Sequence, residues 1–224
     1  MDDFYLLANV NFLPGQYDTW QACYDELAEY VWEKEPSTLA YYFGIPIDYE
    51  KNHSETTMMF AFEAYTNRDG LYETHLESPA MSKFLANALP TMATGLDLMH
   101  YSLSSGFLAP PSRPEPEPCG IMHDTRILAT SPASRDVLLS RLAAIAKVVE
   151  KDDGKTGVLT YMVFKGLDDD TECRIFARYK GQTEMRAHEA RKEMVGFWEM
   201  SREKETKKME QRGYVENGKG WLKR

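Results

Sequence analysis

The sequence has few cysteines and no long apolar run. Its 224 residues include three cysteines, Cys23, Cys119 and Cys173, which are far apart and odd in number. This pattern indicates reduced, mostly buried thiols of an intracellular protein rather than a disulfide framework. No window of about 18 apolar residues exists, so no membrane-spanning helix is expected. The first 15 residues lack the basic start of a secretory signal. We therefore expect a cytoplasmic protein with no membrane partner.

Basic residues are scarce in the first half of the chain. The formal net charge is −9, and residues 1–109 hold 16 Asp and Glu against 4 Lys and Arg. An acidic protein lacks the positive surface that binds phosphate backbones, so we expect no nucleic-acid partner. The sequence also lacks a glycine-rich phosphate loop and any HExxH, CxxC or GxSxG motif. Nucleotide, zinc and serine-hydrolase chemistry therefore have no support in the sequence.

The chain contains an internal repeat. Residues 60–85 read FAFEAYTNRDGLYETHLESPAMSKFL, and residues 175–198 read IFARYKGQTEMRAHEARKEMVGFW. Matching positions lie 113 or 114 residues apart: Phe62 and Phe176, Tyr65 and Tyr179, His75 and His188, Phe84 and Phe197, Gly106 and Gly220, Phe107 and Trp221. So constant an offset indicates two copies of one domain. A hydrophobic content of 43% is ample for packed cores.

The first copy has the order strand, helix, strand, strand, helix, strand, which is the ferredoxin-like plan. The expected strands cover residues 4–12, 38–43, 57–65 and 96–103. Asp18 is expected to cap the first helix. The apolar residues of that helix recur at steps of 4, 3 and 4, which predicts one buried face: Trp20, Tyr24, Leu27 and Val31. Between the last two strands, a short helix carries His75 and a second begins at Ser78-Pro79.

The second copy follows the same plan after a proline-rich segment. Its expected strands cover residues 123–129, 158–164 and 172–179. A helix capped by Ser134 has the same 4, 3, 4 stripe: Leu138, Leu142, Ile145 and Val149. Residues 184–212 are expected to form a long helix with a charged, solvated end. We therefore divide the chain into a domain over 1–109, a semi-rigid tether over 110–120 and a divergent domain over 121–224.

The first copy is similar to antibiotic-biosynthesis-monooxygenase (ABM) domains. The resemblance lies in EPSTLAYY after the first helix, the junction FEAYTNRDGL and the helix pair HLESPAMSKF, and it covers most of residues 4–108. The second copy resembles them less, since Ala177 stands in the place of Glu63 and no Ser-Pro follows its histidine. The resemblance implies an α+β fold in which two tandem ferredoxin-like domains pack their antiparallel sheets into an intramolecular, pseudo-dimeric α+β barrel. Whether the two-domain chain also forms a homodimer stays open.

The resemblance also implies a function. It favours a monooxygenase that needs no cofactor. The expected partners are molecular oxygen and a small hydrophobic aromatic substrate. That substrate would be a phenolic, anthrone-like or quinol molecule of secondary metabolism. Relatives of the same fold act as cyclases, isomerases or heme-degrading enzymes, so the fold alone does not decide the activity. A cofactorless cyclase or isomerase of a polyketide-like substrate and a non-enzymatic small-molecule binding protein stay open as alternatives.

Several side chains of the first copy are candidates for the site. His75 is the expected base, because an unperturbed imidazole titrates near neutral pH. Asn9 could stabilise an oxyanion and Tyr65 could orient a phenol. The expected substrate-binding residues are Tyr41, Tyr42, Met59, Phe62 and Phe84. For each of these residues a purely structural role is the alternative.

Two further expectations concern Glu63 and the two pockets. Glu63 is a candidate acid or base, but it is expected to pair with a basic residue across the sheet. The first copy retains more of the features shared with ABM domains. Its pocket is therefore expected to be the larger and more polar of the two.

Overall fold

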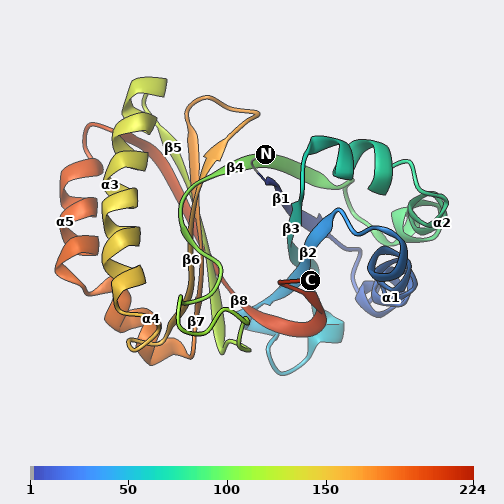
Figure 1. The fold of residues 1–224 in the computed structure, drawn as a ribbon. Helices are drawn as coiled ribbons and strands as arrows, with labels where there is room; N and C mark the ends of the chain where they lie inside the picture. The colour runs from blue at the N-terminus through green and yellow to red at the C-terminus, as the bar shows by residue number, and fades with distance from the viewer. Residues whose placement is uncertain (1–2) are drawn as a thin grey trace. The chain divides into compact units, whose positions relative to one another are not determined.

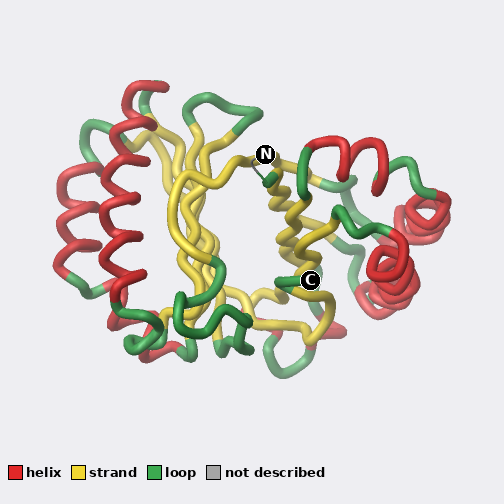
Figure 2. Tube along the Cα trace, viewed as in Figure 1, coloured by secondary structure: helices red, strands yellow, loops and turns green. Residues whose placement is uncertain are grey.

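The computed structural model describes residues 3–224, and Figures 1 and 2 show their helices and strands. By its internal contacts the chain divides into two compact units. Unit 1 comprises the residues up to His100 together with Asn217–Arg224, and unit 2 comprises Tyr101–Glu216. The main elements are β1 (Phe4–Asn11), α1 (Tyr17–Lys34), β2 (Thr38–Pro46), β3 (Met58–Tyr65), η3 (Gly70–His75), α2 (Pro79–Ala88), β4 (Asp97–Phe107), β5 (Ile121–Ala129), α3 (Pro132–Lys151), β6 (Val158–Gly166), β7 (Glu172–Tyr179), α4 (Gln182–Glu189), α5 (Lys192–Ser201) and β8 (Thr206–Trp221). Three short 3₁₀ turns, η1 (Ile47–Tyr49), η2 (His53–Glu55) and η4 (Leu89–Thr91), complete the chain.

In unit 1, β3 pairs antiparallel with β1 on one side and β2 on the other. The helices α1 and α2 lie on one face of these strands (Figure 1). The predicted stripe of α1 faces inward, with Trp20, Tyr24, Leu27 and Val31 each at most 2% exposed. Ser78 caps α2 as expected, because its side chain accepts a hydrogen bond from the Met81 backbone N–H.

Unit 2 repeats the arrangement. Strand β7 pairs antiparallel with β5 and β6, and α3 and α5 lie along one face of these strands (Figure 1). The stripe of α3 is buried as predicted: Leu138, Leu142, Ile145 and Val149. No helix of residues 3–224 combines the length and apolar character that crossing a membrane requires.

The strands β4 and β8 each run from one unit into the other, and the complete strand order, β1-β3-β2-β8-β5-β7-β6-β4, closes into a barrel as predicted. Two glycines explain how the ends of these strands fit. A Cβ at Gly106 would lie 1.9 Å from the carbonyl oxygen of Tyr161, and one at Gly220 would lie 1.8 Å from that of Tyr41. Both glycines also have positive φ, 100° and 75°. The repeated glycine therefore marks a backbone approach that no side chain permits.

Three local expectations were wrong. Residues 184–212 do not form one helix, because α4 and α5 end by Ser201 and the charged run continues as strand β8, paired with β5. Gln16 rather than Asp18 occupies the N-cap position of α1, and its side chain does not bond the helix. Ser131, not Ser134, caps α3, because its hydroxyl accepts from the Ser134 backbone N–H.

The predicted domain boundaries also differ from the compact units. Residues 110–120 lie within unit 2 rather than forming a separate tether. The backbone N–H of Ser112 donates to Asp153 Oδ1 at 2.9 Å, and that of Cys119 donates to Glu216 Oε1 at 2.8 Å. These bonds fasten the proline-rich segment to its own unit. None of the three cysteines is in a disulfide among residues 3–224, and only Cys173 is buried.

Candidate active site

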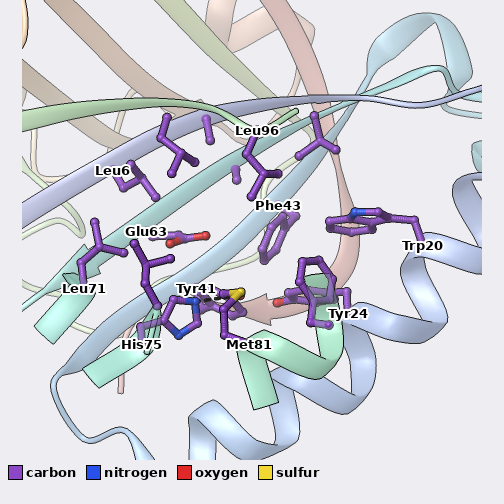
Figure 3. Close-up of a pocket in the computed structure, with 16 residues that line it drawn as sticks. Leu6, Trp20, Tyr24, Tyr41, Phe43, Glu63, Leu71, His75, Met81 and Leu96 are labelled. Carbon is purple, nitrogen blue, oxygen red and sulfur yellow. Dashed lines mark hydrogen bonds between the residues drawn. The ribbon is translucent and has the colours of Figure 1, made fainter. Parts of the chain in front are cut away.

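A small cavity lies in unit 1 between the sheet and the helices (Figure 3). Its volume is about 40 Å³, and its wall is almost entirely apolar. Polar groups reach it from four side chains that come from α1, β2, β3 and η3: Tyr24, Tyr41, Glu63 and His75. Phe84 and Met81 of α2 close it on the helix side. A few ionisable groups in an apolar wall interact strongly, because the local dielectric is low.

His75 is held by a buried carboxylate. It ends η3, a single π-helical turn of a kind that is frequent at functional sites. Its Nδ1 lies 2.7 Å from Oε2 of Glu35, and both residues are 1% exposed. An ionised carboxylate only accepts hydrogen bonds, so the imidazole donates through Nδ1. This leaves Nε2 with its lone pair free to accept a proton.

The Nε2 atom of His75 faces the hydroxyl of Tyr41 at 3.4 Å. Burial, followed by the charge of Glu63, raises the pKa of Tyr41 well above 10. The Tyr41 hydroxyl is therefore a neutral donor at physiological pH. Because 3.4 Å is long for such a bond, the contact leaves Nε2 able to accept a proton from another donor.

Glu63 contributes a second carboxyl group to the cavity. Its Oε2 accepts a 2.6 Å hydrogen bond from the hydroxyl of Tyr65. Burial raises the pKa of Glu63 above its ordinary 4.5, and the charge that His75 carries once it is protonated acts in the opposite direction. The expected ion pair with a basic residue was wrong, since the bonding partner of Glu63 is a tyrosine on its own strand.

The predicted site residues fall on two faces of the sheet. His75, Tyr41 and Phe84 line the cavity, and Tyr65 contacts it through Glu63. Met59 shares the strand face of Glu63 but lies beyond the wall, 3.9 Å from the Asn217 amide nitrogen. The opposite face carries the remaining three: Asn9, Tyr42 and Phe62. Successive strand residues point to opposite sides, so these three do not reach His75.

Sequence reasoning missed the role of Glu35. The segment Glu35-Pro36-Ser37 reads only as the end of a helix, and Glu35 is 40 positions from His75. No local periodicity connects residues so far apart. The one available signal was a carboxylate at the end of the helix that packs beside the repeated histidine.

Unit 2 contains the equivalent cavity with different chemistry. At about 170 Å³ it exceeds the cavity of unit 1, and more polar side chains line it. The expectation that the first pocket would be the larger and more polar was therefore wrong. One cause is visible in the strand register: Tyr41 pairs with Glu63 in unit 1, whereas Tyr161 pairs with the much smaller Ala177 in unit 2.

The carboxylate that holds the histidine also differs between the units. Glu35 follows α1 directly, and Asp152 follows α3 directly. Asp152 is engaged by the guanidinium of Arg191 instead of by His188. The buried carboxylate–histidine pair is therefore a feature of unit 1.

Solved structures resemble the whole chain. A candidate monooxygenase of Lactobacillus acidophilus superimposes with a TM-score of 0.75 at 10% identity, covering 99% of this chain and 97% of that one. A candidate monooxygenase of Fusobacterium nucleatum gives 0.77 at 11% identity, covering 99% and 94%. This chain has the same fold. An anthrone oxidase-like protein gives 0.65 at 11% identity, covering 96% and 91%.

The predicted fold of two tandem ferredoxin-like domains is confirmed by these superpositions over nearly the full chain. No protein-family model and no curated protein matches the sequence. At 10–11% identity the structural likeness concerns the fold and not the chemistry.

Proposed function

We propose that unit 1 carries a cofactor-independent oxygenase that acts on a phenolic, anthrone-like or quinol small molecule. The observation that carries the proposal is the buried Glu35–His75 pair, whose Nε2 faces the Tyr41 hydroxyl in the wall of an apolar cavity. The names of the similar structures, candidate monooxygenases and an anthrone oxidase-like protein, support the same reaction class.

The base in this proposal is His75. Its Nε2 removes a proton from the substrate, and the imidazolium that forms is stabilised by Glu35 at 2.7 Å. The resulting anion is electron-rich enough to reduce oxygen. For an anthrone the balance is R₂CH₂ + O₂ → R₂C=O + H₂O: the substrate supplies all the electrons, one oxygen atom becomes the carbonyl, and the other leaves as water. His75 returns its proton to the peroxide formed on the substrate carbon, and loss of the second C–H proton with cleavage of the O–O bond gives the carbonyl and water.

A protonated Glu63 adds no negative charge to the wall of the cavity. An ionised carboxylate would repel the substrate anion, and the raised pKa of Glu63 keeps its protonated form to a higher pH than an exposed glutamate. The neutral hydroxyl of Tyr41 can turn from Nε2 to the substrate oxygen. The apolar wall excludes water from the reactive intermediate.

Substrate entry requires the helical side of the cavity to move. A volume of about 40 Å³ is room for only about three water molecules. An apolar protein cavity that binds benzene measures roughly 150 Å³. Leu76, Met81 and Phe84 cover the cavity, and they lie on the segment from η3 to α2. Displacement of that segment is therefore part of the proposed cycle.

The test is oxygen uptake by metal-free protein with a panel of anthrones and quinols, with product masses recorded under ¹⁸O₂. His75→Ala should lower turnover by about 10²- to 10⁴-fold, and Glu35→Gln should give a smaller loss. His53→Ala, in η2 and outside the cavity, is the matched control. Substrate conversion without oxygen uptake would instead indicate a cyclase or isomerase, and binding without conversion would indicate a binding protein.

A further inference from the structure

The cavity of unit 2 has an exposed mouth and a buried inner end, as the exposure of its lining residues shows. His188 of α4, Tyr161 of β6 and Tyr179 of β7 form the inner end, and each is at most 3% exposed. Met209 and Gln211 of β8 lie at the exposed mouth. The volume of about 170 Å³ is slightly more than the roughly 150 Å³ in which an apolar protein cavity binds benzene. A molecule with one ring therefore fits.

His188 is the unusual group in this cavity. Neither of its ring nitrogens has a hydrogen-bond partner among residues 3–224, although the side chain is 2% exposed. Buried polar atoms are almost always paired, because leaving one unpaired costs free energy. An imidazole that lines a cavity without protein partners is therefore positioned to bond a ligand.

The charges around the cavity define what that ligand is. Burial, followed by the positive charge of Arg191, lowers the pKa of His188 to about 4. The imidazole is thus neutral at pH 7 and offers one donor and one acceptor. At the mouth, Glu189 Oε1 lies 3.3 Å from Nδ1 of His123. That carboxylate disfavours an anionic ligand, and near His188 the charges of Arg191 and Asp152 are paired with one another.

We infer that this cavity is a binding site for a neutral, one-ring hydroxylated aromatic molecule of the phenol type, with its hydroxyl bonded to His188. The rings of Tyr161 and Tyr179, whose centroids lie 5.2 and 5.6 Å from that of His188, supply the aromatic wall. The site binds without base catalysis, because Asp152 is engaged by Arg191 and does not activate the histidine. It stands independently of the oxygenase proposed for unit 1.

The test uses the full chain with histidine labelled by ¹⁵N and three probes: phenol, toluene and benzoate. Phenol should shift the ring-nitrogen NMR signals of His188, and any shift of the His75 signals reports separately on binding in the unit 1 cavity. Calorimetry should rank phenol above toluene and toluene above benzoate. An unchanged His188 signal at saturating phenol, or equal affinities for phenol and benzoate, would overturn the inference.

Two variants distinguish the contribution of the His188 hydrogen bond to phenol binding from the contribution of the cavity volume. His188→Leu keeps a similar volume and should weaken phenol binding about ten-fold, the effect of losing one hydrogen bond, while toluene binding changes less than two-fold. Ala177→Leu fills the cavity from β7 and should abolish binding of both. Phenol binding that is indifferent to both variants would refute the site. If a variant fails to fold, the shift of the His188 signals that phenol causes in the parent protein is the deciding test.

Discussion

His188 should make the protein sensitive to mild acid. In the folded chain its pKa is lowered from 6.5 to about 4, so the unfolded chain binds the proton more readily. As pH falls below 6.5, the unfolded state is increasingly favoured, and the loss ends near pH 4. A difference of about 2.5 pH units at about 1.4 kcal/mol each amounts to about 3–4 kcal/mol. His188→Leu, which cannot take up a proton, should not show this loss.

The groups around His188 support the sign of this effect. Burial is the main cause, and the charges of Arg191 and His123 add to it, whereas Asp152 acts in the opposite direction. Carboxylates elsewhere also titrate between pH 4 and 6.5, but they are common to the parent and the variant. The difference between the two proteins therefore isolates the histidine.

The assay is urea unfolding of parent and His188→Leu proteins at pH 7, 6, 5 and 4.5. At pH 7 the variant should be at least as stable, because leucine replaces a buried imidazole that lacks protein partners. At pH 4.5 the free energy of unfolding of the parent should be lower than that of the variant by about 2–3 kcal/mol. His53→Leu, a half-buried histidine in η2, serves as the control and should follow the parent. Parallel pH curves for the parent and His188→Leu would refute the reasoning.

Two further predictions concern the backbone and the thiols. Gly220→Ala should destabilise the fold by more than about 3 kcal/mol, because its Cβ would overlap the Tyr41 carbonyl. Gly218→Ala has a similar positive φ, 73°, but open space around it, and should cost about 1–2 kcal/mol. Similar shifts of the melting temperature for both variants would contradict the proposed clash. In native protein at pH 8, iodoacetamide should label the half-buried Cys23 and Cys119 but not the buried Cys173. Burial raises the pKa of the Cys173 thiol to about 12, so little of the reactive thiolate is present. If mass spectrometry finds Cys173 modified first, the prediction is wrong.

The fold could be predicted because its determinants recur at a fixed spacing. The 4, 3, 4 stripes of α1 and α3 are local and are buried as expected. Gly106 and Gly220 were visible as repeated positions, although only the structure gives the reason, a close approach to Tyr161 and Tyr41.

The error over residues 202–212 has a physical cause. This stretch is exposed along most of its length, so its sequence has neither a helical stripe nor an alternating pattern. Its strand conformation comes from pairing with β5, a tertiary contact that outweighs local propensity.

The site was only partly predictable for similar reasons. His75 stood out because the repeat and the family resemblance both contain it. Its partner Glu35 is remote in sequence, and no pattern joins them. Asn9, Tyr42 and Phe62 lie on the other face of the sheet from His75, which the sequence did not reveal because both faces of these strands carry apolar residues.

Glu63 gives the final prediction, which concerns the stability of the fold as pH rises above 4.5. Burial raises its pKa above 4.5, so ionising it in the folded chain is costly. Its contribution to stability is fully present below pH 4.5 and is lost as pH rises through the folded pKa. Glu63→Gln keeps an oxygen that can accept the Tyr65 hydroxyl and removes the titration. The variant should therefore be more stable than the parent, by an amount that increases with pH until the folded pKa is passed.

Turnover provides a second measurement of the same group. Under the proposed mechanism, the ionised Glu63 repels the substrate anion, so activity of the parent should decline as pH rises through the raised pKa of Glu63. Glu63→Gln should lose that decline, whereas Glu73→Gln, an exposed glutamate of η3, should retain it. An alkaline limb that is identical in all three proteins would mean that Glu63 does not face the reacting anion. A Glu63→Gln protein that is less stable than the parent at pH 9 would mean that its carboxylate is stabilised rather than strained by its surroundings.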